Sequence, residues 1–406
     1  MVEKSAIRIL VLDDEPFMLK LLSHMLANQG FTLVRTCDNA LTALEWVDHP
    51  QTLPDLILCD LNMPGMDGIE FVRMLVAHRY TGSLILMSGE DERLLKTVEI
   101  LVKVHQIMVL GCLHKPITPE GLTAMLENWM PSSRGQPRVE KKAYGAEELR
   151  SAIAHHGLVN FYQPKVAVAT GKVVGVETLV RWHHPVDGIV LPDQFIGLAE
   201  AHGLIDDLSR VVLKKALAHA KVWQEAGLAL RVAINMSMDN FSSLDFVDFI
   251  AGTAAEVGVP PQGVVLEVTE SRLMGDLRAP LEALTRLRLK HFHLSIDDFG
   301  TGHSSLAQLR NIPFDELKID QSFVHGAWMD ETVRAIYDAS LSLANQLGME
   351  VVAEGVEDQE DWDFLRRTGC HLAQGHFIAR PMPAADLFGW IETWNDQHRD
   401  GPQHDK

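Results

Sequence analysis

The chain of 406 residues is short of basic residues: 36 Lys and Arg face 55 Asp and Glu, for a formal net charge of −19 at pH 7. DNA and anionic membranes both attract basic surfaces, so this balance argues against nonspecific binding to either. It still permits a small anionic ligand, because bound cations invert the charge of an acidic site.

Cysteines and long apolar runs are also scarce. The four cysteines, at positions 37, 59, 112 and 370, have no C-x-x-C spacing, which favours reduced thiols in a cytoplasmic protein. No apolar run reaches the roughly 18 residues of a membrane-spanning helix, and the apolar stretch before Asp13 is too short for a signal peptide. We therefore expect a cytoplasmic protein without membrane insertion.

The length predicts two or three domains. Residues 131–138 are polar, contain two prolines and have no apolar period, which is typical of a linker. We place one domain at residues 5–130, a linker at 131–144 and a second domain at 145–395.

The first domain alternates short apolar runs with amphipathic stretches. The runs at residues 7–12, 31–36, 56–59, 84–87 and 107–113 predict buried strands, and stretches such as 17–29 and 118–130 predict helices. Five such units predict a doubly wound five-stranded parallel sheet, a fold that binds ligands at the carboxyl ends of its strands.

The second domain alternates in the same way over roughly 250 residues, which predicts a (β/α) barrel with its site at the C-terminal face. A helical pattern covers residues 146–156. Apolar strands are predicted at residues 173–179, 231–235, 264–268, 293–296, 316–319 and 350–353.

Acidic residues gather at the predicted strand ends of the first domain. Asp13 and Asp14 close the first strand, Asp60 closes the third, and Ser88 and Lys115 follow the fourth and fifth. An aspartate can accept a phosphoryl group when Mg²⁺ bridges it to that group and a lysine neutralises the developing charge. The alternative is that these aspartates merely cap the following helices.

This arrangement resembles the receiver domain of two-component response regulators over about residues 5–130. The resemblance implies that Asp13, Asp14 and Asp60 hold one Mg²⁺ or Mn²⁺. It also implies that Asp60 takes phosphate from a sensor histidine kinase or phosphotransfer protein, that Ser88 is the hydroxyl switch, and that Lys115 contacts the phosphate. Receivers usually carry Tyr or Phe three residues before the lysine, and here that position holds a cysteine.

A second acidic cluster follows the strands of the second domain. Asp297 and Asp298 end one apolar strand, and Glu177, Asn235 and Glu267 lie near the ends of others. Carboxylates packed together resist burial unless cations neutralise them, and carboxylate and amide oxygens suit Mg²⁺ or Mn²⁺. Structural alternatives stay open: the Asp pair could cap a helix, and Asn235 could cap a turn.

The order of these residues resembles the EAL-domain cyclic di-GMP phosphodiesterases over about residues 145–395. The signature tripeptide reads Glu177-Thr178-Leu179, with Thr in place of Ala. The middle residue points to the opposite strand face and need not touch a metal. Asp297-Asp298-Phe299-Gly300, Lys318-Ile319-Asp320 and Glu354-Gly355-Val356-Glu357 continue the series.

The resemblance implies two Mg²⁺ or Mn²⁺ ions. Glu177, Asn235, Glu267 and Asp297 would hold the first, and Asp297 would bridge to a second held also by Asp298. Lys318 and Glu354 would take part in catalysis, Glu354 as general base or as outer ligand of the second metal, and Glu270 would brace the loop at residues 298–305. The implied substrate contacts are Gln163, Leu179, Arg181, Asp320, Gln374 and Pro381. For Arg181, cation–π stacking on Trp182 is the structural alternative.

The expected function is that of a response regulator that hydrolyses cyclic di-GMP to linear pGpG by two-metal-ion catalysis, with its rate modulated by phosphorylation of the receiver. The resemblance also implies a homodimer or higher homo-oligomer. One alternative is a receptor or scaffold that binds cyclic di-GMP without cutting it. Another is a transcriptional regulator, which would need a helix-turn-helix and a basic face, and neither is found in the C-terminal part.

Overall fold

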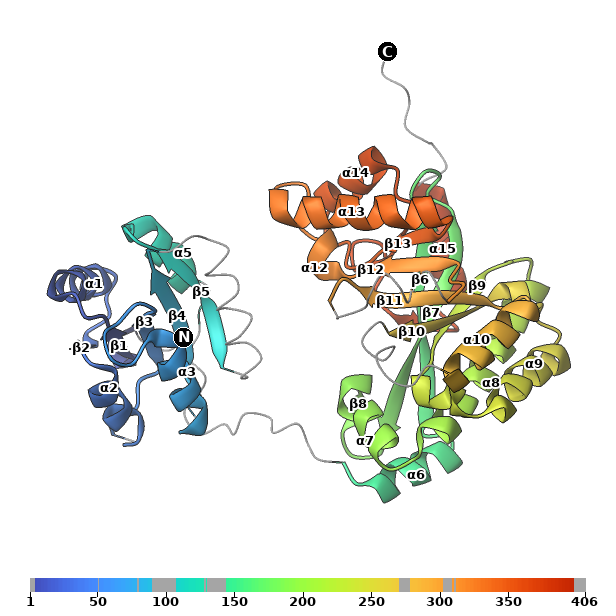
Figure 1. The fold of residues 1–406 in the computed structure, drawn as a ribbon, viewed down its shortest axis with the longest axis horizontal. Helices are drawn as coiled ribbons and strands as arrows, with labels where there is room; N and C mark the ends of the chain where they lie inside the picture. The colour runs from blue at the N-terminus through green and yellow to red at the C-terminus, as the bar shows by residue number, and fades with distance from the viewer. Residues whose placement is uncertain are drawn as a thin grey trace, which may run out of the picture. The chain divides into compact units, whose positions relative to one another are not determined.

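The computed structural model describes residues 4–49, 51–78, 80–89, 107–127, 129, 144–269, 278–301, 309 and 312–397. The chain divides into two compact units, Met1–Glu140 and Lys141–Lys406 (Figure 1). Each unit is described by itself below.

The N-terminal unit is a five-stranded sheet in which all strand pairs are parallel. Its order is β2-β1-β3-β4-β5, which confirms the predicted doubly wound sheet. The strands are β1 (Arg8–Leu12), β2 (Leu33–Cys37), β3 (Leu56–Asp60), β4 (Ser83–Ser88) and β5 (Met108–His114). The helices are η1 (Lys4–Ala6), α1 (Pro16–Asn28), α2 (Ala40–Val47), α3 (Gly68–Ala77) and α5 (Pro119–Glu127).

Two apolar clusters lie on opposite faces of this sheet because successive strand residues alternate in direction. Leu10 and Ile57 belong to one cluster, whereas Ile9 and Leu56 belong to the other. The central strands β3 and β4 are buried along their whole length. The sheet is therefore covered on both faces. Polar groups can reach solvent at the carboxyl ends of its strands.

The C-terminal unit is a closed barrel of eight strands. The strands follow the order β6-β14-β13-β12-β11-β10-β9-β7, and the pairing of β6 with β7 closes the ring. They are β6 (Leu158–Ala167), β7 (Val173–His184), β9 (Arg231–Asn235), β10 (Val264–Thr269), β11 (His293–Phe299), β12 (Glu316–Ile319), β13 (Glu350–Ala353) and β14 (Leu372–Ala373). Outside the ring, β8 (Gly188–Val190) pairs with β7, and β15 (Met382–Pro383) pairs with β6.

The strand β6 departs from a uniformly parallel barrel, and the sequence analysis did not predict it. It is antiparallel to both β7 and β14, whereas the other ring pairs are parallel. A short turn joins β6 to β7, and such a turn can connect only antiparallel strands, since a parallel pair needs a long crossover. The predicted barrel is confirmed with this reversal.

Helices cover the outside of the barrel (Figure 1). They are α6 (Ala146–Ala154), α7 (Ile196–Ala201), α8 (Ile205–Glu225), α9 (Leu244–Val257), α10 (Arg278–Leu289), α12 (Gln321–Val324), α13 (Glu331–Leu347), α14 (Gln359–Thr368) and α15 (Leu387–Gln397), with η2 (Pro192–Gln194), η3 (Met238–Ser242) and η4 (Pro261–Gly263). One large apolar cluster fills the space between helices and strands.

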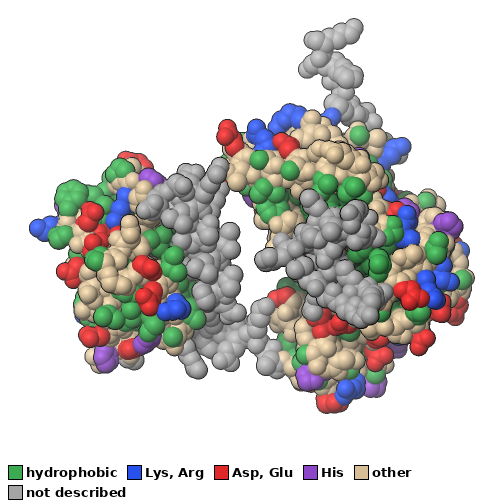
Figure 2. All heavy atoms as spheres, in the orientation of Figure 1, with side chains coloured by type: hydrophobic (Ala, Val, Ile, Leu, Met, Phe, Trp, Pro, Cys, Tyr) green, Lys and Arg blue, Asp and Glu red, His purple; other side chains and the backbone are tan. Residues whose placement is uncertain are grey.

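The surface is mixed in character. Figure 2 shows acidic, basic and apolar side chains interspersed on the visible face of each unit. Among the helices that the structure describes, none has the length and apolar character required to cross a membrane.

Candidate active site and phosphorylation site

The acidic residues of the N-terminal unit meet at the carboxyl edge of the sheet because β1 and β3 are neighbours. Asp13 follows β1 and Asp60 ends β3. The Nζ of Lys115 lies 2.8 Å from Oδ2 of Asp13 and 3.0 Å from Oδ2 of Asp60. Carboxylate oxygens of Asp13, Asp14 and Asp60 lie within 4.8 Å of one another.

Burial dominates the electrostatics of this cluster. It raises the pKa of Asp60 even though Lys115 opposes the shift. Burial also works against the charge of Lys115, but hydrogen bonds to Asp13 and Asp60 raise the pKa of this lysine. Within the described part of the chain, Oδ1 of Asp60 is buried without a hydrogen bond. Three carboxylates, one of which has a buried oxygen without a hydrogen bond, fit a hard cation such as Mg²⁺.

The remaining predicted receiver residues lie close by in the sheet. Ser88 ends β4 and is buried, and its carbonyl accepts a hydrogen bond from the Lys115 amide at 2.8 Å. Cys112, in β5, is half-buried and packs against an apolar cluster of the sheet. The helix-capping alternative is not supported for Asp60, because Asp67 is the residue that caps the following helix α3.

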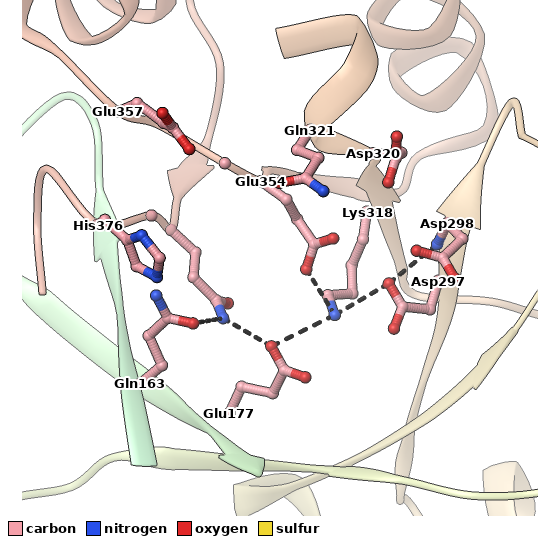
Figure 3. Close-up of a pocket in the computed structure, with 13 residues that line it drawn as sticks. Gln163, Glu177, Asp297, Asp298, Lys318, Asp320, Gln321, Glu354, Glu357 and His376 are labelled. Atoms are coloured by element: carbon pink, nitrogen blue, oxygen red, sulfur yellow. Dashed lines mark hydrogen bonds and ion pairs between the residues drawn. The ribbon is translucent and has the colours of Figure 1, made fainter. Parts of the chain in front are cut away.

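The barrel site is built from residues of β7, β10, β11 and β12 and of the loop after β13, and these residues surround Lys318. Lys318, in β12, is 1% exposed, and Figure 3 shows its side chain among carboxylates from neighbouring strands. Its Nζ lies 2.7 Å from Glu354, 3.0 Å from Asp297, 3.3 Å from Glu267 and 3.5 Å from Glu177. Burial alone would lower the pKa of Lys318, but these carboxylates raise it well above its usual value.

Amide side chains hold Glu177 from two sides. Asn235 Nδ2 donates to Oε1 of Glu177 at 2.8 Å, and Gln374 Nε2 donates to Oε2 of Glu177 at 2.6 Å. Gln374 Nε2 also donates to Gln163 Oε1 at 2.9 Å. The side-chain amide of Asn235 thus bonds to Glu177, whereas Ser237 caps the next turn. The turn-capping alternative for Asn235 is therefore not supported.

The pKa values of three further carboxylates, those of Glu267, Glu354 and Asp298, are raised. Burial raises the pKa of Glu267 to about 7 despite two nearby lysines, and it raises the pKa of Glu354 well above its usual range. Burial and the charge of Asp297 raise the pKa of Asp298 to about 6. Asp298 also has a positive φ of 57°, which is uncommon outside glycine. The ionised forms of these carboxylates are costly in this buried site, and a bound cation would stabilise them.

Two groups of carboxylates could each hold a cation. In both Glu177/Glu267/Asp297 and Asp297/Asp298/Glu354, one oxygen from each member lies within 4.8 Å of the others. Asp297 belongs to both groups. Hard oxygen donors in this number suit Mg²⁺ or Mn²⁺, so the residues present fit the implied metals.

A cleft of about 320 Å³ opens over these carboxylates. Of the predicted substrate contacts, Gln163, Asp320 and Gln374 line it, whereas Leu179, Arg181 and Pro381 do not. The lining also includes Gln321, Glu357 and His376, to which the sequence analysis gave no role (Figure 3).

Arg181 makes the kind of contact foreseen in the structural alternative, but with a different ring. Its guanidinium lies 5.7 Å from the ring centroid of Phe161, and Nη1 donates to the carbonyl of Val180 at 2.9 Å. The predicted residue Glu270 lies outside the described residues, as do residues 302–305 of the loop at residues 298–305.

Sequence reasoning missed two charged residues inside the barrel, Lys165 and Glu316. Lys165 Nζ lies 2.7 Å from Oε1 of Glu267 and 3.0 Å from Oε1 of Glu316. A signal was available, because Lys165 lies two residues after Gln163 and Glu316 two residues before Lys318. Strand residues two apart share a face, so each pair points into the barrel together.

Comparison with protein families supports both units. The family model described as EAL domain matches residues 146–381, and the response regulator receiver domain model matches residues 9–127. The cyclic di-GMP phosphodiesterase RocR of Pseudomonas aeruginosa is 33% identical over 386 residues, which cover 93% of this chain and 96% of RocR.

Other relatives match the barrel alone. The bifunctional diguanylate cyclase/cyclic di-GMP phosphodiesterase MucR of P. aeruginosa is 41% identical over 60% of this chain, but the match spans only 36% of MucR. A solved structure described as the PaMucR phosphodiesterase in complex with c-di-GMP has 40% identity and a TM-score of 0.57, covering 59% of this chain and 98% of that chain. The chain therefore belongs to the EAL domain family and joins that domain to a response regulator receiver domain.

Proposed function

We propose that this protein is a phosphodiesterase that hydrolyses cyclic di-GMP to linear pGpG with two divalent cations. The observation that carries the proposal is Asp297, which belongs to two carboxylate groups at once. A shared carboxylate of this kind is the natural bridge in a two-metal site. The activities in the names of RocR and MucR support the choice of substrate.

Each carboxylate then has a role in holding metal. Glu177, Glu267 and Asp297 would hold one cation with Asn235 beside them, and Asp297, Asp298 and Glu354 would hold the other. Mg²⁺ or Mn²⁺ would supply charge stabilisation and a more acidic bound water. The grouping of Glu354 with the Asp pair favours an outer-ligand role for it.

The other residues of the site would bind and orient the substrate. Lys318 would steady the negative charge that develops on the phosphate, since its ammonium lies at the centre of the carboxylates. Gln163, Gln374 and Asp320 line the cleft and would contact the nucleotide. Arg181, Leu179 and Pro381 remain proposed contacts, and Glu270 a proposed brace.

The alternative is a receptor that binds cyclic di-GMP without cutting it. Purified protein incubated with cyclic di-GMP and Mg²⁺, followed by chromatography, separates the two functions. Linear pGpG should appear with the wild type and not with Asp297→Asn. Nucleotide binding without any product from the wild type would favour the receptor.

We also propose that phosphorylation of Asp60 modulates this activity. Support comes from the position of Asp60 beside Asp13, Asp14 and Lys115, where a cation and an ammonium can neutralise an incoming phosphoryl group. A sensor histidine kinase or phosphotransfer protein would supply that group. A homodimer or higher homo-oligomer stays a prediction, which light scattering on the full chain would check.

A further inference from the structure

A second ion cluster inside the barrel shares Glu267 with the proposed metal-binding carboxylates. Lys165 of β6, Glu267 of β10 and Glu316 of β12 form it, and their side chains are 4%, 0% and 4% exposed. Glu316 precedes Lys318 by two residues on the same strand, so it faces the same interior closer to the amino end of β12. Lys165 and Glu316 therefore lie beneath the site, and neither lines the cleft that substrate would enter.

The two oxygens of Glu267 have different neighbours. Oε1 accepts from Lys165 Nζ at 2.7 Å, whereas Oε2 lies 3.3 Å from Lys318 Nζ, on the side of Glu177 and Asp297. A carboxylate that accepts a short hydrogen bond through one oxygen cannot rotate freely. Lys165 thus sets the direction in which the second oxygen points.

Glu316 balances the charge of Lys165. It lies 3.0 Å from the ammonium, and Ser295 Oγ donates to the same oxygen of Glu316 at 2.9 Å. A buried lysine alone would neutralise Glu267 and weaken it as a ligand, because opposite charges interact strongly away from water. Paired with Glu316, the lysine orients Glu267 while the pair adds no net charge.

We propose that Lys165 is a positioning residue that directs Glu267 toward the metal, and that Glu316 keeps Lys165 from cancelling the charge of that ligand. This inference rests on the metal-binding part of the proposed function. It assigns a task to two residues that do not line the cleft. Partners that orient a metal ligand from outside typically change metal affinity about 10- to 100-fold when they are removed.

The test is calorimetric titration of the full-length protein with Mn²⁺ in the absence of nucleotide. All variants carry Asp13→Asn, which removes a predicted ligand of the receiver cation, so that the barrel dominates the signal. Lys165→Met and Glu316→Gln should each weaken Mn²⁺ binding about tenfold or more. The matched control is Lys215→Met on α8, whose ammonium contacts the backbone carbonyl of Leu158, and it should bind Mn²⁺ like the parent.

Hydrolysis provides a second readout. At saturating Mn²⁺ the KM for cyclic di-GMP should stay within about twofold of the parent value in Lys165→Met, because the residue lies outside the cleft. Wild-type Mn²⁺ affinity in folded Lys165→Met would overturn the proposal. If Lys165→Met does not fold, unchanged affinity in Glu316→Gln would overturn it instead.

Failure of the proposed function is distinguishable from failure of this inference. A parent protein that binds Mn²⁺ but leaves cyclic di-GMP intact contradicts the phosphodiesterase, while weaker Mn²⁺ binding by Lys165→Met would still support the positioning role. A parent whose barrel binds no Mn²⁺ would overturn both.

Discussion

At the scale of single residues, Lys318 is a buried ammonium surrounded by carboxylates. Its buried ammonium lies within 3.5 Å of carboxylates from four different parts of the chain. Such a charge can stabilise a substrate phosphate only where it is already held in place. The same environment makes the lysine costly to replace, since the carboxylates would lose a buried counter-charge.

We expect Lys318→Ala to lower kcat for cyclic di-GMP about hundred- to thousandfold at saturating Mg²⁺, the cost typical of losing one preorganised electrostatic group. Steady-state kinetics measures the loss, and circular dichroism should show unchanged secondary structure. A folded variant that turns over at the wild-type rate would remove Lys318 from the site.

Thr178, the middle residue of the signature tripeptide, offers a contrasting case. It is buried, and its hydroxyl has no hydrogen-bond partner within the described residues. Leaving a buried hydroxyl unpaired costs about 1–3 kcal/mol. Its side chain points away from the face of Glu177 because neighbours on a strand alternate.

We therefore expect Thr178→Val to raise the stability of the barrel by about 1 kcal/mol, or about 2–4 °C in Tm, without changing kcat. Thermal unfolding and hydrolysis assays measure the two effects. Thr178→Ala is the matched control, since it removes the hydroxyl but also leaves a small cavity and should gain less. A lower Tm for the valine variant would show that the hydroxyl is satisfied.

At the scale of elements, the loop after β13 shows how helices hold the site. This loop carries Glu354 and Glu357, and the fully buried carboxylate of Asp361 in α14 anchors it. Asp361 accepts from the amides of Glu357 and Gly326, each at 3.1 Å, and contacts His325 Nδ1 at 2.8 Å. One carboxylate thus joins the end of α12, the loop and the start of α14.

The contact between His325 and Asp361 predicts a pH-dependent contribution to stability. The hydrogen bond to Asp361 raises the pKa of His325, and burial of the ring opposes this shift without reversing it. A raised folded-state pKa adds stability that is fully present below the unfolded pKa of about 6.5 and is lost as pH rises through the folded value.

Urea unfolding of the wild type and His325→Gln should therefore differ more at pH 5.5 than at pH 8.5. The difference should stay below about 1 kcal/mol, because the histidine side chain is half exposed. In an Asp361→Asn background the pH-dependent difference should shrink to the smaller contribution of Asp358 and Glu357, which also raise the pKa of His325. A difference that grows with pH would contradict the assigned sign.

At the scale of the whole molecule, the acidic chain has one carboxylate group that could hold a cation at the sheet edge of the N-terminal unit, and two such groups that share Asp297 in the barrel. Each lies at the carboxyl ends of parallel strands, where both doubly wound sheets and barrels place their ligands. The chain thus joins a proposed phosphorylation site in the receiver to a proposed site of phosphodiester hydrolysis in the EAL domain.

We expect beryllofluoride, a phosphoryl mimic, to change the rate of cyclic di-GMP hydrolysis by the wild type and not by Asp60→Asn. Coupling between sites is typically about 1–3 kcal/mol, or about five- to a hundredfold. Cys112 replaces the usual aromatic switch residue, so we expect the lower end of that range. Equal rates with and without the mimic in both proteins would leave the receiver a role in assembly alone.

Much of the fold and of the site follows from the sequence by itself. Apolar runs alternating with amphipathic stretches determine the two parallel-sheet architectures, because buried strands and covering helices have different periods. Asp13 and Asp60, and likewise Glu177 and Asp297, could be expected to converge, because the carboxyl ends of parallel strands meet at one edge or face.

Only the tertiary structure decided the contacts between distant positions. Lys165 meets Glu267 and Glu316 across 102 and 151 residues of chain, and Arg181 stacks on Phe161 rather than on its neighbour Trp182. The reversal of β6 and the closure of the ring bring these groups together. The local sequence pattern determines which face of a strand a side chain occupies. The residue that this side chain contacts depends on which strands become neighbours, and the closed barrel fixes those neighbours.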